Sequence, residues 1–269
     1  MSETGLVPER DISHEEIERY RSDGYLVLRD VVAAAKVTAF RDAVREVVAR
    51  HAEPRPPAPL RDTYAKAFVQ VFNAWTFDPR VRELVFDPGL ARLAARLMGV
   101  SRLRLFCDEV LYKEPGAGHT PWHQDLSACP FEPNTGITLW IPLCEVSVEM
   151  GTMYFARGSH EAGELGPYDI SDETDRDLGA FVRERGLECV DTGPMLPGDL
   201  SFHDGWIVHG ANENRTGQMR EVIVLHYFPD GQRVAAPTNP TRERLLGAVA
   251  PLLRPGDLAA CELWPRVPW

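Results

Sequence analysis

The chain has 269 residues, 44% of them hydrophobic, and its 40 Asp and Glu outnumber its 29 Lys and Arg to give a net charge of -11 at pH 7. This acidic balance argues against a nucleic-acid partner, which would favour a basic face. No segment approaches the roughly eighteen apolar residues of a membrane-spanning helix, and the N-terminus lacks a basic region followed by an apolar one, so we expect no membrane partner and a cytoplasmic location.

Helical signals dominate the first hundred residues. Ser13 and Glu16 form a capping box, which predicts the start of a short helix, and Gly24 ends it. Two Asp-Pro steps, at Asp78 and Asp87, each predict an N-cap followed by proline at the first helical position. The expected helices cover residues 14–22, 33–50, 79–86 and 88–98, with a short buried strand at 25–28.

Two stretches in this helical part have a less regular pattern. Residues 53–59 include four prolines, which predict an exposed, non-helical loop that could flank the mouth of a pocket. Residues 67–75 have helical spacing, so we predict a helix that buries Phe68, Phe72 and Trp75 in the core. The alternative is that one or two of these rings edge a substrate site.

From residue 102 the apolar residues alternate, and short apolar runs separated by turn residues indicate an antiparallel sandwich or barrel. The expected strands cover residues 102–115, 137–143, 153–155, 187–190, 200–202, 207–209 and 222–228. A charged insertion at 161–186 is interpreted as a lid, a binding loop or a disordered segment. We predict one domain: a helical part at about 1–100, a β-rich core at about 101–229 and an irregular tail at 230–269.

His123 and Asp125 lie two positions apart in the segment TPWHQD. In a strand, residues i and i+2 share a face, so the two side chains could bind one metal ion from the same side. A second histidine would complete the two-histidine, one-carboxylate pattern of non-haem Fe(II) oxygenases. Both His203 and His209 lie near apolar runs and compete for this role. The five cysteines show no close pairing, which favours reduced thiols over disulfides or a zinc cluster.

Taken in order, these segments make the chain resemble the phytanoyl-CoA dioxygenase family of Fe(II)- and 2-oxoglutarate-dependent oxygenases. The resemblance is carried by residues 23–28, 122–125, 151–160, 197–203 and 209–210, with Asn214 and Arg220. It implies a mainly β fold, a double-stranded β-helix (jelly roll) with helices packed on its larger sheet.

The same resemblance implies that His123, Asp125 and His209 bind iron and that Arg220 holds the far carboxylate of 2-oxoglutarate, a task that suits its planar guanidinium. The spacing to Arg220 favours His209 over His203.

Three further side chains are candidates for the co-substrate site. The resemblance implies a tryptophan near the co-substrate, which Trp140 fits, and by alternation Thr138 shares its face. Lys113 ends the strand before the His-x-Asp motif, where it either meets an anionic group or lies on the surface beside a turn. The sequence departs from the family pattern at Ala211, where many members carry a serine.

The function that we predict is hydroxylation of an unactivated C–H bond in a small molecule, using Fe(II), 2-oxoglutarate and O2, in bacterial specialised metabolism. The carboxylate of Asp125 argues against halogenation, because related halogenases have a small residue there to admit halide. Desaturation, cyclisation and epimerisation by the same site are alternatives. Two less favoured hypotheses are a cupin-like metalloenzyme without 2-oxoglutarate and a non-catalytic binding module. The sequence does not indicate an oligomeric state.

Overall fold

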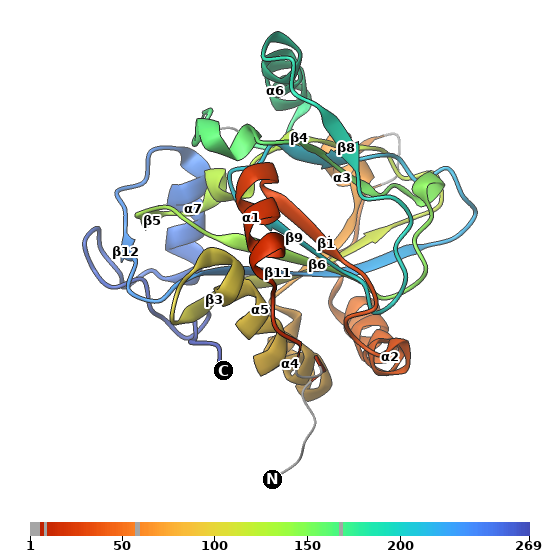
Figure 1. Cartoon of the computed structure of the whole chain (residues 1–269), viewed down its shortest axis with the longest axis horizontal. Helices are drawn as coiled ribbons and strands as arrows, with labels where there is room; N and C mark the ends of the chain where they lie inside the picture. The colour runs from red at the N-terminus through yellow and green to blue at the C-terminus, as the bar shows by residue number, and fades with distance from the viewer. Residues whose placement is uncertain (1–5, 8–9, 57–59, 167–168) are drawn as a thin grey trace.

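Two antiparallel sheets face each other and form the body of the protein (Figure 1). We describe a computed structural model in which residues 6–7, 10–56, 60–166 and 169–269 are placed. The larger sheet has six strands in the order β1-β9-β6-β11-β3-β2, and the smaller has four in the order β4-β10-β7-β8. The expectation of a β-rich double-sheet fold with a helical flank is confirmed.

The strands of the larger sheet are β1 (Tyr25–Leu28), β2 (Val69–Phe72), β3 (Leu103–Lys113), β6 (Ile137–Pro142), β9 (Leu200–Asp204) and β11 (Arg220–Pro229). Those of the smaller sheet are β4 (Thr120–His123), β7 (Met153–Ala156), β8 (Cys189–Asp191) and β10 (His209–Ala211). A separate ribbon pairs β5 (Phe131–Glu132) with β12 (Arg233–Val234).

Helices of the N-terminal part cover the face of the larger sheet that points away from the smaller one (Figure 1). They are α1 (His14–Asp23), α2 (Ala34–His51), α4 (Pro79–Val85) and α5 (Pro88–Met98). The short helix α3 (Thr63–Ala67) instead packs against β4 of the smaller sheet. The capping box of Ser13 and Glu16 is present, and Asp78 and Asp87 each accept backbone N–H groups at the start of a helix whose first residue is proline. These predicted helix boundaries are therefore confirmed within a residue or two.

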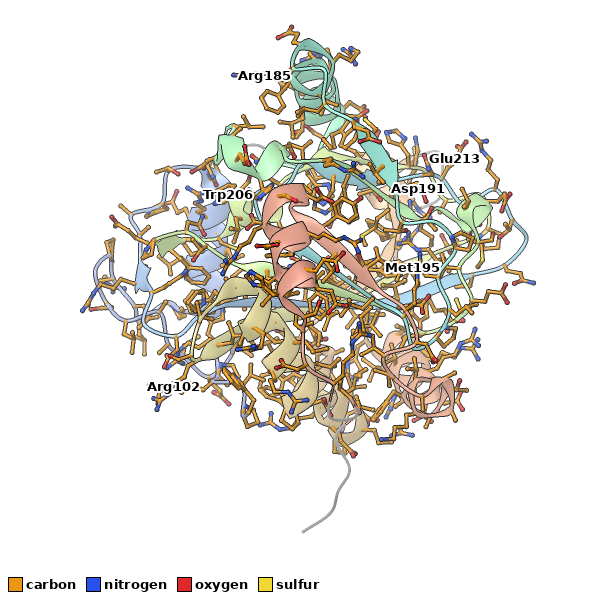
Figure 2. The ribbon with its side chains drawn as sticks, viewed as in Figure 1. Arg102, Arg185, Asp191, Met195, Trp206 and Glu213 are labelled. Atoms are coloured by element: carbon orange, nitrogen blue, oxygen red, sulfur yellow. The ribbon has the colours of Figure 1, made fainter. Side chains whose placement is uncertain are left out.

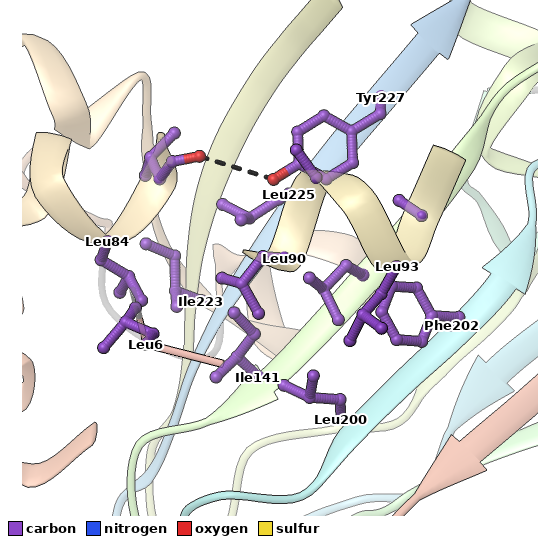
Figure 3. Close-up of a cluster of buried hydrophobic side chains, with 14 of the residues drawn as sticks. Leu6, Leu84, Leu90, Leu93, Ile141, Leu200, Phe202, Ile223, Leu225 and Tyr227 are labelled. Carbon is purple, nitrogen blue, oxygen red and sulfur yellow. Dashed lines mark hydrogen bonds between the residues drawn. The ribbon is translucent and has the colours of Figure 1, made fainter. Parts of the chain in front are cut away.

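Alternation along β11 divides the interior into two layers. Ile223, Leu225 and Tyr227 point toward the helices and pack with α4 and α5 (Figure 3). Tyr227 also donates a hydrogen bond to the carbonyl of Val85 at 3.4 Å. Each fully buried aliphatic side chain of this layer contributes about 1.5–3 kcal/mol. Val224, with the opposite parity, points into the space between the sheets, which is where the functional site lies.

The predicted helix over residues 67–75 is wrong. The helix α3 ends at Ala67, and β2 (Val69–Phe72) pairs antiparallel with β3. Helical and strand patterns both fit such a short apolar run, and pairing with a long neighbouring strand decides between them. The core assignment also fails for Phe72, which is 51% exposed, whereas Phe68 is buried.

The described part of the insertion, residues 161–166 and 169–186, and the tail at 230–269 contain more regular structure than we predicted. Helix α6 (Asp172–Glu184) begins at Ser171, whose side chain accepts from Thr174 N, and it packs on β4. The tail contributes β12 and α7 (Pro240–Val249), so it is not wholly irregular. Within the tail, Leu258 is exposed, whereas Trp264 is buried.

The view with side chains shows how these additions sit on the sheets. Arg185, at the end of α6, points outward, and Asp191 lies on β8 (Figure 2). Asp191 accepts from Thr152 Oγ1 at 2.8 Å, which ties β8 to the start of β7. Across the placed residues, no helix has both the length and the apolar character needed to cross a bilayer.

Candidate metal centre and its two cavities

Three side chains that could hold a metal ion meet at one end of the smaller sheet. Strands β4 and β10 pair antiparallel with His209 directly opposite His123. Gln124 keeps an extended backbone, so Asp125, which opens a 3-10 turn, still points to the same side as His123. Asp125 Oδ1 lies 3.5 Å from His123 Nε2 and 3.6 Å from His209 Nε2. One ligand atom from each residue lies within 4.8 Å of the others, close enough to share one ion.

Backbone carbonyls orient both imidazoles. His123 Nδ1 lies 2.8 Å from the carbonyl oxygen of Pro121, and His209 Nδ1 lies 3.1 Å from that of Ile207. Each carbonyl accepts, so each Nδ1 carries the proton and each Nε2 presents its lone pair toward Asp125. Burial, with His123 nearby, lowers the pKa of His209 well below its usual range, which keeps that ring neutral. Both rings therefore have the tautomer that a metal ligand needs.

The two oxygens of Asp125 have different surroundings. Oδ2 accepts from Thr138 Oγ1 at 2.7 Å and lies 3.0 Å from His203 Nε2, whereas Oδ1 faces the two histidines. His203 thus contacts Asp125 from behind, and the geometry leaves Oδ1 for a metal.

Arg220, on β11, lines the same cavity as the three candidate ligands. Its side chain is buried, Nη1 donates to the carbonyl of Gly151 at 2.5 Å, and Nε has no partner. No carboxylate of the placed residues forms an ion pair with it, and burial lowers its pKa to about 9. A buried cation without a counter-ion is costly. The arrangement therefore fits an anionic ligand held between Arg220 and the metal.

The cavity that joins them has a volume of about 80 Å³. At about 10–15 Å³ per water, this is the space of about six waters, which suits a small organic acid rather than a large substrate. Its apolar walls include Met153, Val224 and Ala211.

The structure separates the remaining candidates of the co-substrate site. Trp140 is buried, lines the small cavity and lies 5.8 Å from the guanidinium carbon of Arg220. Thr138 also lines the small cavity, but its hydroxyl donates a hydrogen bond to Asp125 Oδ2. The third candidate, Lys113, is buried with its ammonium over the Phe68 ring, donates to the Gly118 carbonyl and lines neither cavity described here. Burial, with Arg220 nearby, lowers the pKa of Lys113 to about 6.

A hydrogen-bonded chain that the sequence did not suggest extends from Asp125. Thr138 Oγ1 lies 3.0 Å from His226 Nδ1, and His226 Nε2 lies 3.3 Å from Glu109 Oε2. His226 lines both cavities. Strand parity was the available signal for Glu109, because this residue pairs with Val224 on β11, whose side chain points into the space between the sheets. Beyond Glu109 the chain continues through Gln70 to the Tyr64 hydroxyl.

A second, larger cavity of about 480 Å³ adjoins the first. The two share His123, Asp125, Thr138, Glu109 and His226 in their walls, so they meet at the candidate metal centre. Two rings lie near the candidate ligands in sequence: Phe131 lines the larger cavity, while Trp206 (Figure 2) donates through Nε1 to the carbonyl of Asn134. The centre is thus placed between a small polar-ended space and a large one.

A double-stranded β-helix with two histidines and one carboxylate at one end is the arrangement of non-haem Fe(II) oxygenases. The family model described as phytanoyl-CoA dioxygenase (PhyH) matches residues 20–222. The chain belongs to this family.

Named relatives of known activity extend along most of the chain. The methylphosphonate hydroxylase of Gimesia maris is 27% identical over 227 residues, which cover 80% of each protein. Among solved structures, the α-ketoglutarate-dependent epimerase SnoN from nogalamycin biosynthesis is 28% identical, with a TM-score of 0.77 over 94% of this chain and 97% of that one. The carbocyclase SnoK from the same biosynthesis is 27% identical, with a TM-score of 0.76 over 96% and 97%.

Proposed function

We propose that this protein is an Fe(II)- and 2-oxoglutarate-dependent oxygenase that hydroxylates an unactivated C–H bond of a small molecule, in the cytoplasm and in bacterial specialised metabolism. The observation that carries the proposal is the buried, incompletely paired guanidinium of Arg220 facing His123, Asp125 and His209 across a small cavity. A cupin-like metalloenzyme without a dicarboxylate co-substrate would leave that cation without a purpose.

In this proposal His123, Asp125 and His209 hold Fe(II) through Nε2, Oδ1 and Nε2. Iron held there would supply, with 2-oxoglutarate and O2, the oxidising power for C–H oxidation, and 2-oxoglutarate would be converted to succinate and CO2. The protein's own contribution is ligation, orientation and exclusion of water. Arg220 holds the far carboxylate, and Trp140 with its apolar neighbours forms a dry wall around it.

Asp125 supports oxygen insertion over halogenation. Its Oδ2 is held by Thr138 and His203, so the carboxylate is fixed with Oδ1 toward the metal position. A halide would need that position to be vacant. Hydroxylation therefore needs no change to the arrangement that the side chains already have.

Epimerisation or ring closure is a second candidate, which the likeness to SnoN and SnoK favours. The three outcomes differ in product mass. Hydroxylation adds one oxygen, oxidative ring closure removes two hydrogens, and epimerisation leaves the mass unchanged. Mass spectrometry of the first substrate that is turned over therefore chooses between them.

The test of the proposal is succinate release from 2-oxoglutarate, measured with Fe(II) against a panel of small molecules in air and under argon. We expect substrate-stimulated succinate release in air, its loss in argon, and its loss in His209→Ala. The control is Arg215→Gln, which changes an exposed arginine that pairs with Glu213. Turnover under strict anaerobiosis without succinate would instead support a cupin-like metalloenzyme.

A further inference from the structure

The larger cavity has the size and the position of a substrate site. At about 480 Å³ it lies within the usual range of small-molecule pockets, roughly 300–1,000 Å³. It has six times the volume of the small cavity and shares with it the walls at the candidate metal centre. A molecule placed here would reach the centre through a cavity that Arg220 does not line.

Aromatic side chains form much of its wall. Phe131 stacks on Phe228 with 4.2 Å between ring centroids and meets Phe106 edge-on at 5.5 Å, so these rings support one another in fixed orientations. Phe72 lines the cavity while leaving 51% of its surface exposed, which places a large apolar side chain at the opening. Rigid rings in such a wall favour a ligand that itself contains rings.

Apart from Asp125, His123 and His226 at the candidate metal centre, charged groups in this wall are few and separated. Glu109 lies next to the metal centre and is largely buried, whereas Asp169 and Arg244 are exposed. Arg244 is the single Lys or Arg among the described lining residues, and its Nη2 donates to Thr241 Oγ1 at 2.8 Å. A phosphate or phosphonate is bound by several convergent cationic groups, which this wall does not provide.

We propose that the larger cavity takes a bulky, ring-containing and largely apolar molecule without phosphate groups, whose hydroxyl or amino group donates a hydrogen bond to Glu109. This proposal rests on the proposed function, because the molecule bound in the larger cavity is taken to be the one that is oxidised. It sets the chain apart from a relative that hydroxylates a small phosphonate, because the cavity is too large and too poor in cations for such a ligand.

A matched pair of probes tests this proposal. Calorimetry compares 4-methylumbelliferone, a two-ring phenol, with 4-methylumbelliferyl phosphate, first on metal-free protein and then with Fe(II) and 2-oxoglutarate under argon. We expect the phenol to bind and the phosphate to bind at least tenfold more weakly. Phe72→Ala should weaken the phenol about three- to tenfold, and Glu109→Gln should also weaken it. The control Phe77→Ala removes a ring that is 45% exposed but lies outside the cavity.

Equal or tighter binding of the phosphate, no binding of either probe, or binding that ignores both Phe72→Ala and Glu109→Gln would each overturn the substrate class. Binding to metal-free protein keeps this result independent of the oxygenase chemistry. If 4-methylumbelliferone binds but Fe(II) and 2-oxoglutarate do not, the proposed function fails while the proposed ligand class of the larger cavity stands.

A second inference comes from a different observation, an unpaired hydroxyl in the small cavity. Thr120 is buried on β4, directly opposite Ala211 on β10 in the strand register. Both residues line the cavity that contains Arg220, and Thr120 Oγ1 has no hydrogen-bond partner among the described residues. Buried hydroxyls are almost always paired, so an unpaired one in the same cavity as a guanidinium whose Nε has no partner points to a shared ligand.

We infer that Thr120 Oγ1 donates a hydrogen bond to the 2-oxoglutarate that Arg220 holds, supplying the hydroxyl that Ala211 does not. The readout is the dissociation constant of 2-oxoglutarate under argon. Thr120→Val should raise it about tenfold or more, as expected for losing a hydrogen bond to a charged group. Thr120→Ser should stay near wild type, and adding Ala211→Ser to Thr120→Val should restore part of the affinity.

The control is Ser201→Ala, which removes another buried and unpaired hydroxyl that lies outside the cavity lining. Unfolding of the ligand-free protein separates a structural role from a binding role. We expect Thr120→Val to be as stable as wild type. A dissociation constant within twofold of wild type, or equal losses in Thr120→Val and Ser201→Ala, would overturn the inference.

Discussion

Replacing Arg220 by methionine should stabilise the ligand-free protein and abolish co-substrate binding at the same time. Burial lowers the pKa of Arg220 from 12.5 to about 9. At 1.36 kcal/mol per pH unit, keeping this cation buried costs the folded protein up to about 5 kcal/mol. In other proteins, replacing a buried ion pair by apolar side chains of similar volume is neutral or stabilising by about 1–4 kcal/mol, and a buried cation without a counter-ion should gain no less. We therefore expect Arg220→Met to have a higher free energy of unfolding in urea at pH 7.

Removing the Arg220 guanidinium also removes the partner of the far carboxylate of 2-oxoglutarate. Removing one member of a buried charge pair costs about 2–5 kcal/mol, so the dissociation constant of 2-oxoglutarate should rise by about thirtyfold to several thousandfold. Calorimetry under argon measures this change. Arg215→Met, at an exposed arginine, should alter neither quantity. The reasoning is refuted if Arg220→Met binds 2-oxoglutarate within threefold of wild type, or if it unfolds more easily by about 3–5 kcal/mol, as it would if the native arginine were already paired.

Three further predictions concern the supports of the site. Thr138→Val removes one of two hydrogen bonds to Asp125 Oδ2, so Fe(II) affinity should fall about 10–100-fold in a metal titration; unchanged affinity would contradict the role. Gly210→Ala should lower the free energy of unfolding by about 1–3 kcal/mol, because the added Cβ would lie 2.8 Å from the backbone oxygen of Thr120 on β4. The control Gly217→Ala should be neutral, because a Cβ there has no atom within 4 Å. Lys113→Met should stabilise the protein most below pH 6. The pKa of Lys113 is about 6 in the folded protein and 10.5 ordinarily, so the wild-type protein gains stability as the pH rises from 6 to 10.5. A pH-independent difference between the two proteins would rule out this cause.

The residues of the candidate centre could be predicted because each carries a local signal. His123 and Asp125 share a face by strand parity, and the family spacing selects His209 and Arg220. The structure brings these four together, and it also explains why His203 competed, since His203 contacts the same carboxylate from the other side. Helix boundaries at Asp78 and Asp87 were equally local, because a cap and a proline act within one turn.

What the sequence missed depends on contacts between distant segments. Strand β2 exists because β3 offers it a partner, while residues 67–75 alone also fit a helix. Helix α6 buries its apolar side on β4, and its many charges concealed that face. The chain from Thr138 through His226 to Glu109 joins three strands, so no single segment could reveal it.

In the proposed function, His123, Asp125 and His209 would hold the iron that binds 2-oxoglutarate. The most direct measurement is an anaerobic titration of the Fe(II)-loaded protein with 2-oxoglutarate, followed by visible absorption. We predict a metal-to-ligand charge-transfer band that saturates at one equivalent and is lost in Asp125→Ala, which should also bind iron poorly. Absence of the band in wild type, together with unchanged iron binding in Asp125→Ala, would contradict the assignment.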